Sequence, residues 1–402
     1  MTIINHRLPR FALFLSALLL ASSLAGGRPA AAEEPYDLHV IIPLTGNAAL
    51  LGQEEQQFLT LLEGQVNREG GIRGRPLRLV FHDDQTNPQV AVQIATEVIA
   101  KHPPIFLGPS IVAECNAITP LLRDGPVMYG FSPGVHPDPG SNVFSVSTST
   151  HDMMAALLRH FRLQGWTRVA LITSTDATGQ DVDKGIDQLM ALPENKDLTI
   201  VAHPHFAIGD VTVSAQIERV RAADPQVLVA WTTGNAIATI FKGIIQAGLD
   251  IPIATTNGNQ NRMQMVQYTG FLPKQMYYAS SMFPPHEGLI TLDPRVETAQ
   301  HAMQRAVAAG GLNPDNQTSI VWDALLITVD TLRKLGPDAT PAQVREHIAG
   351  ITDFGGINGL YNFKEVPQRG LGADAAIVTR WDPEQQRWIW VSGPGGTALS
   401  SQ

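Results

Sequence analysis

Short apolar runs alternate with longer amphipathic stretches along most of this chain. The run at 38–43 is followed by a helical stretch to Asn67 and then by a second apolar run at 77–81. This order is typical of β-α-β units, in which consecutive strands lie parallel and a helix connects them. The same alternation continues to residue 131 and begins again after the segment 145–150. The pattern therefore predicts an α/β fold with two Rossmann-like lobes, each built on a parallel sheet.

The first residues have the composition of a secretory signal peptide. An apolar run at 11–20 follows three cationic side chains and precedes small residues that end at Ala32. A run this short, followed by a small-residue cleavage site, is typical of a segment removed on export rather than of a membrane anchor. We therefore expect residues 1–32 to be removed on export and the mature protein to be freely soluble.

Length and charge narrow the classes of protein. Removal of residues 1–32 from the 402-residue chain leaves 370 residues, which is more than one hydrophobic core usually serves, so two domains are expected. The formal net charge of −9 becomes about −12 without the three arginines of that segment. An acidic balance without a basic stripe argues against a nucleic-acid partner. The only cysteine, Cys115, can form no internal disulfide and lies too far along the chain to carry a lipid anchor.

No group of residues has the spacing of a catalytic or metal site. Cys115 has no histidine or aspartate at catalytic spacing, so a buried structural thiol is expected. His203 and His205 flank a proline without a nearby carboxylate or cysteine, which does not make a zinc site. The run at 82–84, with the sequence HDD, closes a predicted strand and is interpreted as structural. We therefore predict no catalytic residue, no bound metal and no cofactor, and we favour a binding protein over an enzyme.

Several short motifs occur in an order that resembles one known family. They are IPLTG at 42–46 and VNREGGIRG at 66–74, followed by Gly108-Pro109-Ser110, Gly165-Trp166 and Thr178-Gly179. Over residues 36–391 the chain resembles the leucine-type, or type I, periplasmic solute-binding proteins of ABC importers, which include binders of branched-chain amino acids and of aromatic acids. The resemblance implies a monomeric protein that captures a small molecule and delivers it to a membrane permease.

The resemblance also implies three crossings of the chain between the lobes. We place them at 145–150, 280–284 and 355–360, because each segment is rich in Gly, Ser, Thr or Pro. The first lobe would comprise residues 33–147 and 284–356, and the second residues 148–283 and 357–402. Residues at such crossings absorb the backbone rotation when a cleft closes on its ligand. The cleft itself is expected at the carboxyl ends of the strands.

Loops that follow strands in both lobes provide the candidate ligand contacts. Ser110 precedes a predicted helix, where free N–H groups and the hydroxyl can hold an anionic group, although the serine can equally serve only as a helix N-cap. Trp231 ends a predicted strand and can form an aromatic wall or part of the core, whereas Thr232 and Thr233 are expected to face the ligand. His136 is expected at the surface. The predicted contacts are Leu51, Ser110, Val112, Ala113, Phe131, Ser132, Thr178, Trp231, Thr232, Thr233, Asn257 and Arg262.

The position after the strand at 253–255 separates two classes of ligand. Amino-acid binders of this family place an acidic residue there to hold the α-ammonium, whereas this chain has Asn257. Burial of an unpaired ammonium costs several kcal/mol, more than one neutral hydrogen bond returns. We therefore predict a non-amino organic acid, such as a benzoate or a cinnamate, with its carboxylate balanced by Arg262 and the helix start at Ser110. The alternatives are an amino acid whose ammonium is held by an acid from another loop, and a ligand-sensing subunit of a receptor.

Overall fold

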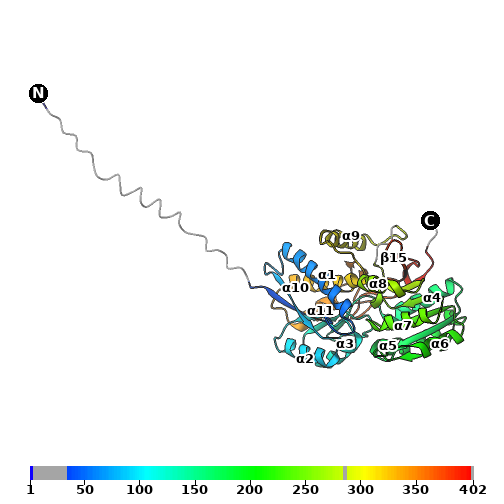
Figure 1. Cartoon of the computed structure of the whole chain (residues 1–402). Helices are drawn as coiled ribbons and strands as arrows, with labels where there is room; N and C mark the ends of the chain where they lie inside the picture. The colour runs from blue at the N-terminus through cyan, green and yellow to red at the C-terminus, as the bar shows by residue number, and fades with distance from the viewer. Residues whose placement is uncertain (3–33, 284–287, 400–402) are drawn as a thin grey trace.

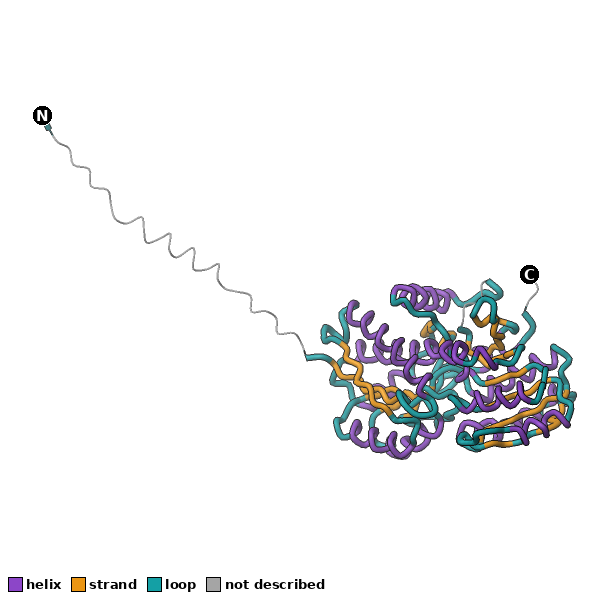
Figure 2. The backbone as a smooth tube through the Cα atoms, viewed as in Figure 1, coloured by secondary structure: helices purple, strands orange, loops and turns teal. Residues whose placement is uncertain are grey.

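The computed structural model describes residues 1–2, 34–283 and 288–399. The predicted signal peptide and its cleavage site therefore lie outside the described residues, apart from the first two positions. The described chain forms two α/β lobes that lie side by side, with helices covering the faces of each sheet (Figures 1 and 2). Within the described parts, no helix combines the length and the apolar character that crossing a membrane would require.

The first lobe is built on a five-stranded sheet in which all neighbouring strands run parallel. The strand order is β2-β1-β3-β4-β5. Its elements are β1 (Tyr36–Ile42), α1 (Ala49–Arg68), β2 (Leu77–Asp83), α2 (Pro88–Ile99), β3 (Ile105–Leu107), α3 (Val112–Ile118), β4 (Val127–Gly130) and β5 (Val143–Ser145). The central strands are largely buried and mostly apolar because helices cover both faces of the sheet, and Asp37 and His39 of β1 are the polar exceptions.

The second lobe contains a larger sheet with the strand order β15-β14-β11-β10-β9-β6-β7, and β8 also pairs with β6. Its elements are α4 (Thr150–Leu163), β6 (Arg168–Ser174), α5 (Ala177–Met190), β7 (Thr199–Ala202), β8 (His205–Phe206), α6 (Ser214–Ala222), β9 (Val227–Trp231), α7 (Ala236–Gln246), β10 (Ile253–Thr255), α8 (Arg262–Gln267), β11 (Met276–Ser281), β14 (Ala376–Asp382) and β15 (Arg387–Trp390). The last two strands form an antiparallel hairpin at one edge of an otherwise parallel sheet.

The chain returns to the first lobe between β11 and β14. This return contains α9 (Pro294–Ala309), α10 (Asn316–Leu335), α11 (Pro341–Ala349), β12 (Phe354–Gly356) and β13 (Gly359–Tyr361). Helix α10 packs on α1 and contributes a row of buried side chains to the core of the first lobe. Figure 1 shows α1, α10 and α11 within the same lobe. The sequence pattern correctly predicted an α/β fold with two parallel-sheet lobes.

The chain crosses between the two sheets three times. The first crossing joins β5 to α4, at the segment 145–150 where it was placed from the sequence. The second follows Ser281, and its predicted last residue, 284, lies outside the described residues. The third differs from the prediction at 355–360, because Tyr361, Phe363 and Leu371 pack in the core of the first lobe and only β14 joins the second sheet. We therefore propose that residues 357–375 belong to the first lobe and that the glycines at 355–359 serve the turn of the β12–β13 hairpin.

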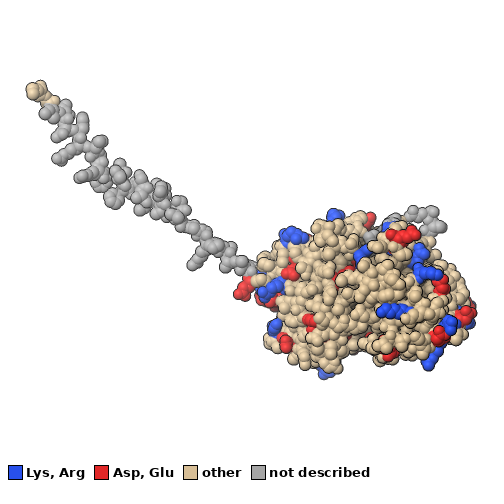
Figure 3. Space-filling view, viewed as in Figure 1, with Lys and Arg blue, Asp and Glu red and all other residues tan. Residues whose placement is uncertain are grey.

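Charged side chains are dispersed over the protein surface. On the face shown in Figure 3, lysines and arginines are interspersed with aspartates and glutamates, and the described residues of that face form no continuous basic patch. The distribution agrees with the acidic net charge of −9. An electrostatic footprint for a phosphate backbone would require a basic stripe.

Candidate functional site

A cleft between the two sheets brings together most of the predicted ligand contacts. Its walls include nine of the twelve, namely Leu51, Ser110, Val112, Phe131, Ser132, Thr178, Trp231, Thr233 and Asn257. Most of these residues follow the carboxyl ends of strands, where parallel α/β sheets bind their ligands. The space left for water is about 30 Å³, which holds roughly two water molecules. The cleft is therefore nearly closed in this conformation.

The first wall of the cleft is the turn between β3 and α3. Gly108 has a φ of +80°, and a Cβ added to it would lie 1.9 Å from the Ile41 carbonyl oxygen, so only glycine fits here. The turn delivers Ser110, whose hydroxyl donates to Glu55 Oε2 at 2.6 Å. Burial raises the pKa of the Glu55 carboxyl well above its usual range. Ser110 is not the N-cap of α3, because Ile111 occupies that position without a side-chain hydrogen bond.

Side chains at the end of β9 form the opposite wall. Trp231 and Thr233 line the cleft, whereas Thr232 is fully buried on the other side of the backbone. Side chains of an extended chain alternate in direction, so Trp231 and Thr233 share one side of the backbone and Thr232 faces the other. Trp231 also packs in the core of the second lobe, and both interpretations of this residue therefore apply. Its indole Nε1 is buried and has no hydrogen-bond partner among the described residues.

Asn257 follows β10 and closes the end of the cleft in the second lobe. Its side chain lines the cleft and is only 2% exposed, so it does not face bulk solvent. Asn257 Oδ1 accepts a hydrogen bond from the Thr256 hydroxyl at 3.0 Å. Asn257 Nδ2 has no partner within the described chain. A buried N–H donor without a partner costs about 1–3 kcal/mol, so the site favours a ligand that presents an acceptor here.

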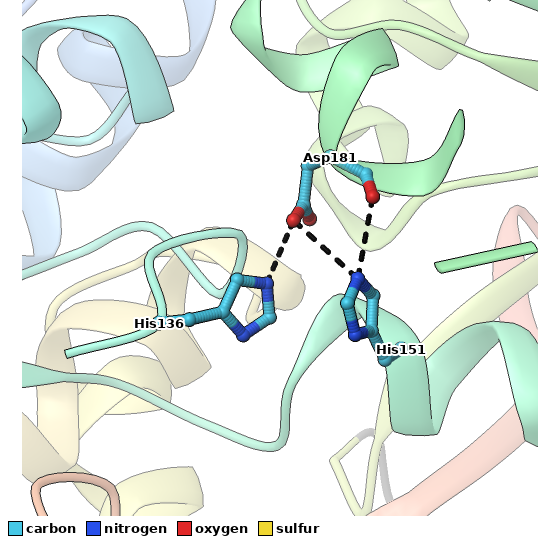
Figure 4. A group of neighbouring side chains, drawn as sticks. All are labelled: His136, His151 and Asp181. Atoms are coloured by element: carbon cyan, nitrogen blue, oxygen red, sulfur yellow. Dashed lines mark hydrogen bonds and ion pairs between the residues drawn. The ribbon is translucent and has the colours of Figure 1, made fainter. Parts of the chain in front are cut away.

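The cleft contains an acidic side chain that sequence reasoning missed. Asp181 lies on α5, three residues after Thr178 and therefore on the same face of the helix. Asp181 Oδ1 lies 2.7 Å from His136 Nε2, the Thr150 hydroxyl donates to Asp181 Oδ2, and His151 Nε2 lies 3.2 Å from the Asp181 carbonyl oxygen (Figure 4). Burial alone would raise the pKa of Asp181, but the hydrogen bonds from these side chains outweigh it and hold the pKa below its usual value.

Contacts between the lobes hold the cleft closed on two sides. On one side His136, from the loop after β4, contacts Asp181 of the second lobe. The His136 side chain is therefore partly exposed and also bridges the two lobes. On the other side Asn47 Nδ2 donates to the Thr233 carbonyl at 3.2 Å, and the Asn235 N–H donates to the Asn47 carbonyl at 3.0 Å. The structure therefore represents a closed conformation of the two lobes.

Three predicted contacts lie outside the cleft wall. Ala113 is one residue too far along α3, and Thr232 points away as described above. Arg262 begins α8 and its Nη1 donates to the Gln386 carbonyl at 2.7 Å, while its guanidinium lies 5.8 Å from the centre of the Trp388 ring. Arg262 is therefore not placed to balance a carboxylate beside Ser110.

Eight residues of the cleft wall were not predicted. They are Ile111, Pro133, Gly134, Thr150, Asp181, Thr256, Gly258 and Ile320. Most of them lie within or next to loops that the sequence had already indicated, so a search for hydroxyl and carboxylate groups in those loops could have found Thr150 and Thr256. Asp181 was detectable from its spacing relative to Thr178. Ile320 has no local signal, because it reaches the cleft only through the packing of α10 on the first lobe.

The remaining reactive side chains have structural surroundings. Cys115 is fully buried, its Sγ donates to the Pro109 carbonyl at 3.2 Å, and burial raises the pKa of the thiol well above its usual value. A thiol with so little thiolate is a poor nucleophile. Asp83 accepts hydrogen bonds from the backbone N–H groups of Leu44 and Thr45 at 2.9 and 3.1 Å and so shapes the loop that leads to the cleft.

Comparisons with known proteins agree with this architecture. A family model for periplasmic binding proteins matches residues 38–386. The Leu/Ile/Val-binding protein homolog 3 of Brucella melitensis is 24% identical over 53% of this chain, and the match spans 58% of that relative's own length. Among solved structures, an extracellular ligand-binding receptor from Rhodopseudomonas palustris HaA2 has a TM-score of 0.77 at 17% identity, over 89% of this chain and 100% of that one. The branched-chain amino acid transporter substrate binding protein LivJ from Streptococcus pneumoniae, in complex with isoleucine, has a TM-score of 0.73 at 17% identity, over 88% of this chain and 98% of that one.

The structural matches are too distant in sequence to establish more than the fold, whereas the family match extends over most of the chain. The two-lobed architecture and the cleft between the sheets agree with it. The chain belongs to the periplasmic binding protein family.

Proposed function

We propose that this chain is the exported solute-binding subunit of an ABC importer and that it captures a small organic acid, specifically an aromatic carboxylate, without chemical turnover. The observation that carries the ligand class is a pair of buried donors in the cleft wall. Trp231 Nε1 and Asn257 Nδ2 each lack a hydrogen-bond partner among the described residues. A ligand carboxylate offers several acceptor sites and can satisfy both donors, whereas an ammonium offers none.

The start of α3 supports an acceptor on the other side of the cleft. The hydroxyl of Ser110 currently donates to Glu55. Burial raises the pKa of Glu55 well above its usual value and so favours the protonated carboxyl, which can itself donate to Ser110 Oγ. In that arrangement the serine hydroxyl hydrogen is free to bind a ligand carboxylate. With Glu55 protonated, the Glu55–Ser110 pair provides a donor without placing a negative charge beside the ligand.

The rest of the wall suits an apolar body. Leu51, Val112, Phe131 and Ile320 supply aliphatic and aromatic surface, and the ring of Trp231 forms part of the wall of the second lobe. Small-molecule sites typically combine such a lining with a few converging polar groups. An aromatic acid matches this division between an apolar end and an acceptor-rich end.

A branched-chain amino acid is the second candidate, and Asp181 is the observation that favours it. Its carboxylate lines the cleft and carries a negative charge, so it can hold an α-ammonium that Asn257 cannot. The Brucella relative is also named for leucine, isoleucine and valine. Asp181 already accepts hydrogen bonds from His136 and Thr150, which is why we rank this candidate second.

Titration calorimetry on matched variants separates the two candidates. We expect wild-type protein to bind a benzoate or a cinnamate with micromolar or tighter affinity. Asn257→Asp should weaken this binding by about 100-fold, because it places a like charge beside the carboxylate in a dry cleft. Asn257→Ala, which only removes a donor, should cost about 10-fold.

The same variants give the opposite result if the ligand is an amino acid. Asn257→Asp would then retain or strengthen the binding of leucine, isoleucine or valine, and Asp181→Asn would abolish it. Micromolar binding of one of these amino acids, with no heat from any aromatic acid, would contradict the proposal of a carboxylate ligand without an amine.

Binding should be accompanied by closure of the lobes. The closed cleft holds roughly two water molecules, so a ligand can enter only when the cross-lobe contacts of Asn47 and His136 open. Small-angle X-ray scattering should therefore give a larger radius of gyration for the ligand-free protein than for the saturated complex. Asn257→Asp protein in the same ligand concentration serves as the control and should keep the larger radius. An identical radius for wild-type protein with and without ligand would refute the closure.

We further propose that residues 1–32 direct export to the periplasm and that a monomer delivers the solute to a membrane permease. A ligand-sensing subunit of a receptor has the same fold, and the similar Rhodopseudomonas protein is named an extracellular ligand-binding receptor. Uptake of labelled ligand by cells that lack this protein distinguishes the two roles. Transport is supported if uptake is lost, whereas intact uptake with a lost transcriptional or behavioural response supports sensing.

A further inference from the structure

A second group of polar side chains lies in the second lobe, apart from the residues that line the cleft. Asp183 on α5 meets His203, which lies between β7 and β8, and His205, which begins β8. Asp183 Oδ1 lies 2.9 Å from His203 Nε2, and Asp183 Oδ2 lies 3.0 Å from His205 Nε2. The two imidazole rings are stacked with their centres 4.7 Å apart. One ligand atom from each of the three residues lies within 4.8 Å of the other two.

This arrangement supplies the carboxylate that the sequence seemed to lack. His203 and His205 were set aside as metal ligands because no acidic residue or cysteine stands near them in the sequence. Helix α5 brings Asp183 to them from twenty positions earlier, through the packing of the helix beside β6. The Thr173 hydroxyl at the end of β6 donates to Asp183 Oδ1 at 2.9 Å and fixes the carboxylate in this orientation. The two histidines therefore share the Asp183 carboxylate as a common partner.

We propose that Asp183, His203 and His205 form a binding site for one divalent transition-metal ion, with Zn²⁺ as the reference case. Two imidazole nitrogens and one carboxylate oxygen are donors that such ions prefer, whereas Mg²⁺ and Ca²⁺ prefer oxygen alone. A tetrahedral Zn²⁺ ion about 2.0–2.1 Å from each donor holds neighbouring donors about 3.3 Å apart. The two Asp183–His pairs, at 2.9 and 3.0 Å, therefore need only a small shift to bind it. The metal takes the place of the imidazole protons that otherwise lie between these atoms.

The exposure of the three side chains suits metal entry. Asp183 and His203 are each 24% exposed and His205 is 46% exposed, so the donors are anchored by packing yet reachable from solvent. A metal here would tie α5 to the edge strand of the second lobe. Because α5 also carries Thr178 and Asp181 of the cleft wall, the ion would stiffen one side of the ligand site. This inference is independent of the proposed ligand class.

The cluster of His136, His151 and Asp181 is the competing candidate and serves as the control. There both imidazoles approach the same oxygen, with His136 Nε2 at 2.7 Å and His151 Nε2 at 3.5 Å from Asp181 Oδ1. One of the donors also belongs to the other lobe, so this cluster assembles only in the closed conformation (Figure 4). The Asp183 cluster lies within one lobe and is preformed.

The experiment is calorimetric titration of the mature chain with ZnCl₂, on protein purified without a polyhistidine tag and stripped with a chelator. We expect one Zn²⁺ to bind with a dissociation constant in the micromolar range or below. Asp183→Asn and His205→Gln should each weaken this binding by at least about 100-fold. Loss of a residue that only hydrogen-bonds to a metal ligand typically weakens metal affinity by about 10- to 100-fold. His136→Gln and His151→Gln should leave it unchanged. A saturating ion should also raise the melting temperature of wild-type protein by a few degrees, and not that of His205→Gln.

Two kinds of result would overturn the site. One is wild-type protein that binds Zn²⁺ no more tightly than millimolar. The other is binding that persists in both Asp183→Asn and His205→Gln or disappears in His136→Gln, since the ion would then lie elsewhere. Thermal unfolding of each variant in the presence of chelator first shows whether it is folded. If Asp183→Asn or His205→Gln does not fold, the other variant alone tests the site.

Discussion

Replacement of Arg369 by methionine is expected to lower the free energy of unfolding by about 3 to 5 kcal/mol. Arg369 is 5% exposed and its guanidinium donates to four backbone carbonyls. Nη1 bonds Val146 and Ser147 of the first crossing, and Nη2 bonds Pro133 and Val135 of the loop that leads into the cleft. Methionine fills much of the same space but leaves these carbonyls buried without a donor. Urea unfolding followed by circular dichroism measures the loss.

Two further substitutions show that the fork of donors matters, rather than bulk or charge. Arg369→Lys keeps the charge but cannot span two pairs of carbonyls. It should therefore lower the free energy of unfolding by about half as much as Arg369→Met. Arg380→Met removes an exposed arginine from β14 and should change stability by no more than about 0.5 kcal/mol. If Arg369→Met unfolds at the same urea concentration as Arg380→Met, the hydrogen bonds of the Arg369 guanidinium to the crossing and the cleft loop do not stabilise the protein. Because Pro133 lines the cleft, ligand affinity should fall together with stability in Arg369→Met.

Stability should decrease as the pH rises from 5 to 8, owing to buried carboxyls in the first lobe. Burial, with a contribution from the charge of Asp84, raises the pKa of Glu114 to about 7, and burial raises the pKa of Asp84 to about 7. One oxygen of each carboxyl has no hydrogen-bond partner among the described residues. In the unfolded chain both groups ionise near their ordinary pKa values, which are 4.5 for Glu114 and 3.8 for Asp84.

The sign follows from where the protons are bound. Between the unfolded and the folded pKa, the folded protein retains a proton that the unfolded chain has lost, so raising the pH favours unfolding. The stability contributed by protonated Glu114 is complete below about pH 4.5 and is lost as the pH rises through 7. At about 1.4 kcal/mol per pKa unit, this single group accounts for about 3 kcal/mol.

Glu114→Gln tests this assignment because glutamine is isosteric and does not titrate. The free energy of unfolding is measured in urea at several pH values between 5 and 7. Its decrease with pH should be smaller in Glu114→Gln than in the wild type, by about 1.4 kcal/mol per pH unit. Glu218→Gln, on the exposed side of α6, is the matched control and should retain the wild-type slope. A Glu114→Gln profile parallel to that of the wild type would show that the carboxyl does not hold its proton in the folded protein.

The elements of the fold were predictable because each is specified within a short stretch of chain. Short apolar runs, separated by amphipathic stretches, identified the parallel strands and their connecting helices. The loops at the carboxyl ends of those strands then contained most of the cleft wall, including Ser110, Phe131, Trp231 and Asn257.

The contacts that define the site were decided by tertiary structure, because periodicity states which face of an element is buried but not which distant segment covers it. Glu55 reaches Ser110 across fifty-five positions, and Asp183 reaches His203 across twenty. For the same reason we propose a third crossing beyond 355–360, since the β12–β13 hairpin has strand-like residues and turn glycines and packs on the first core. Arg262 lies on α8 outside the cleft wall and contacts Gln386, whereas Asp181 lines the cleft. Local patterns thus predict elements, whereas the pairing of polar groups depends on how those elements pack.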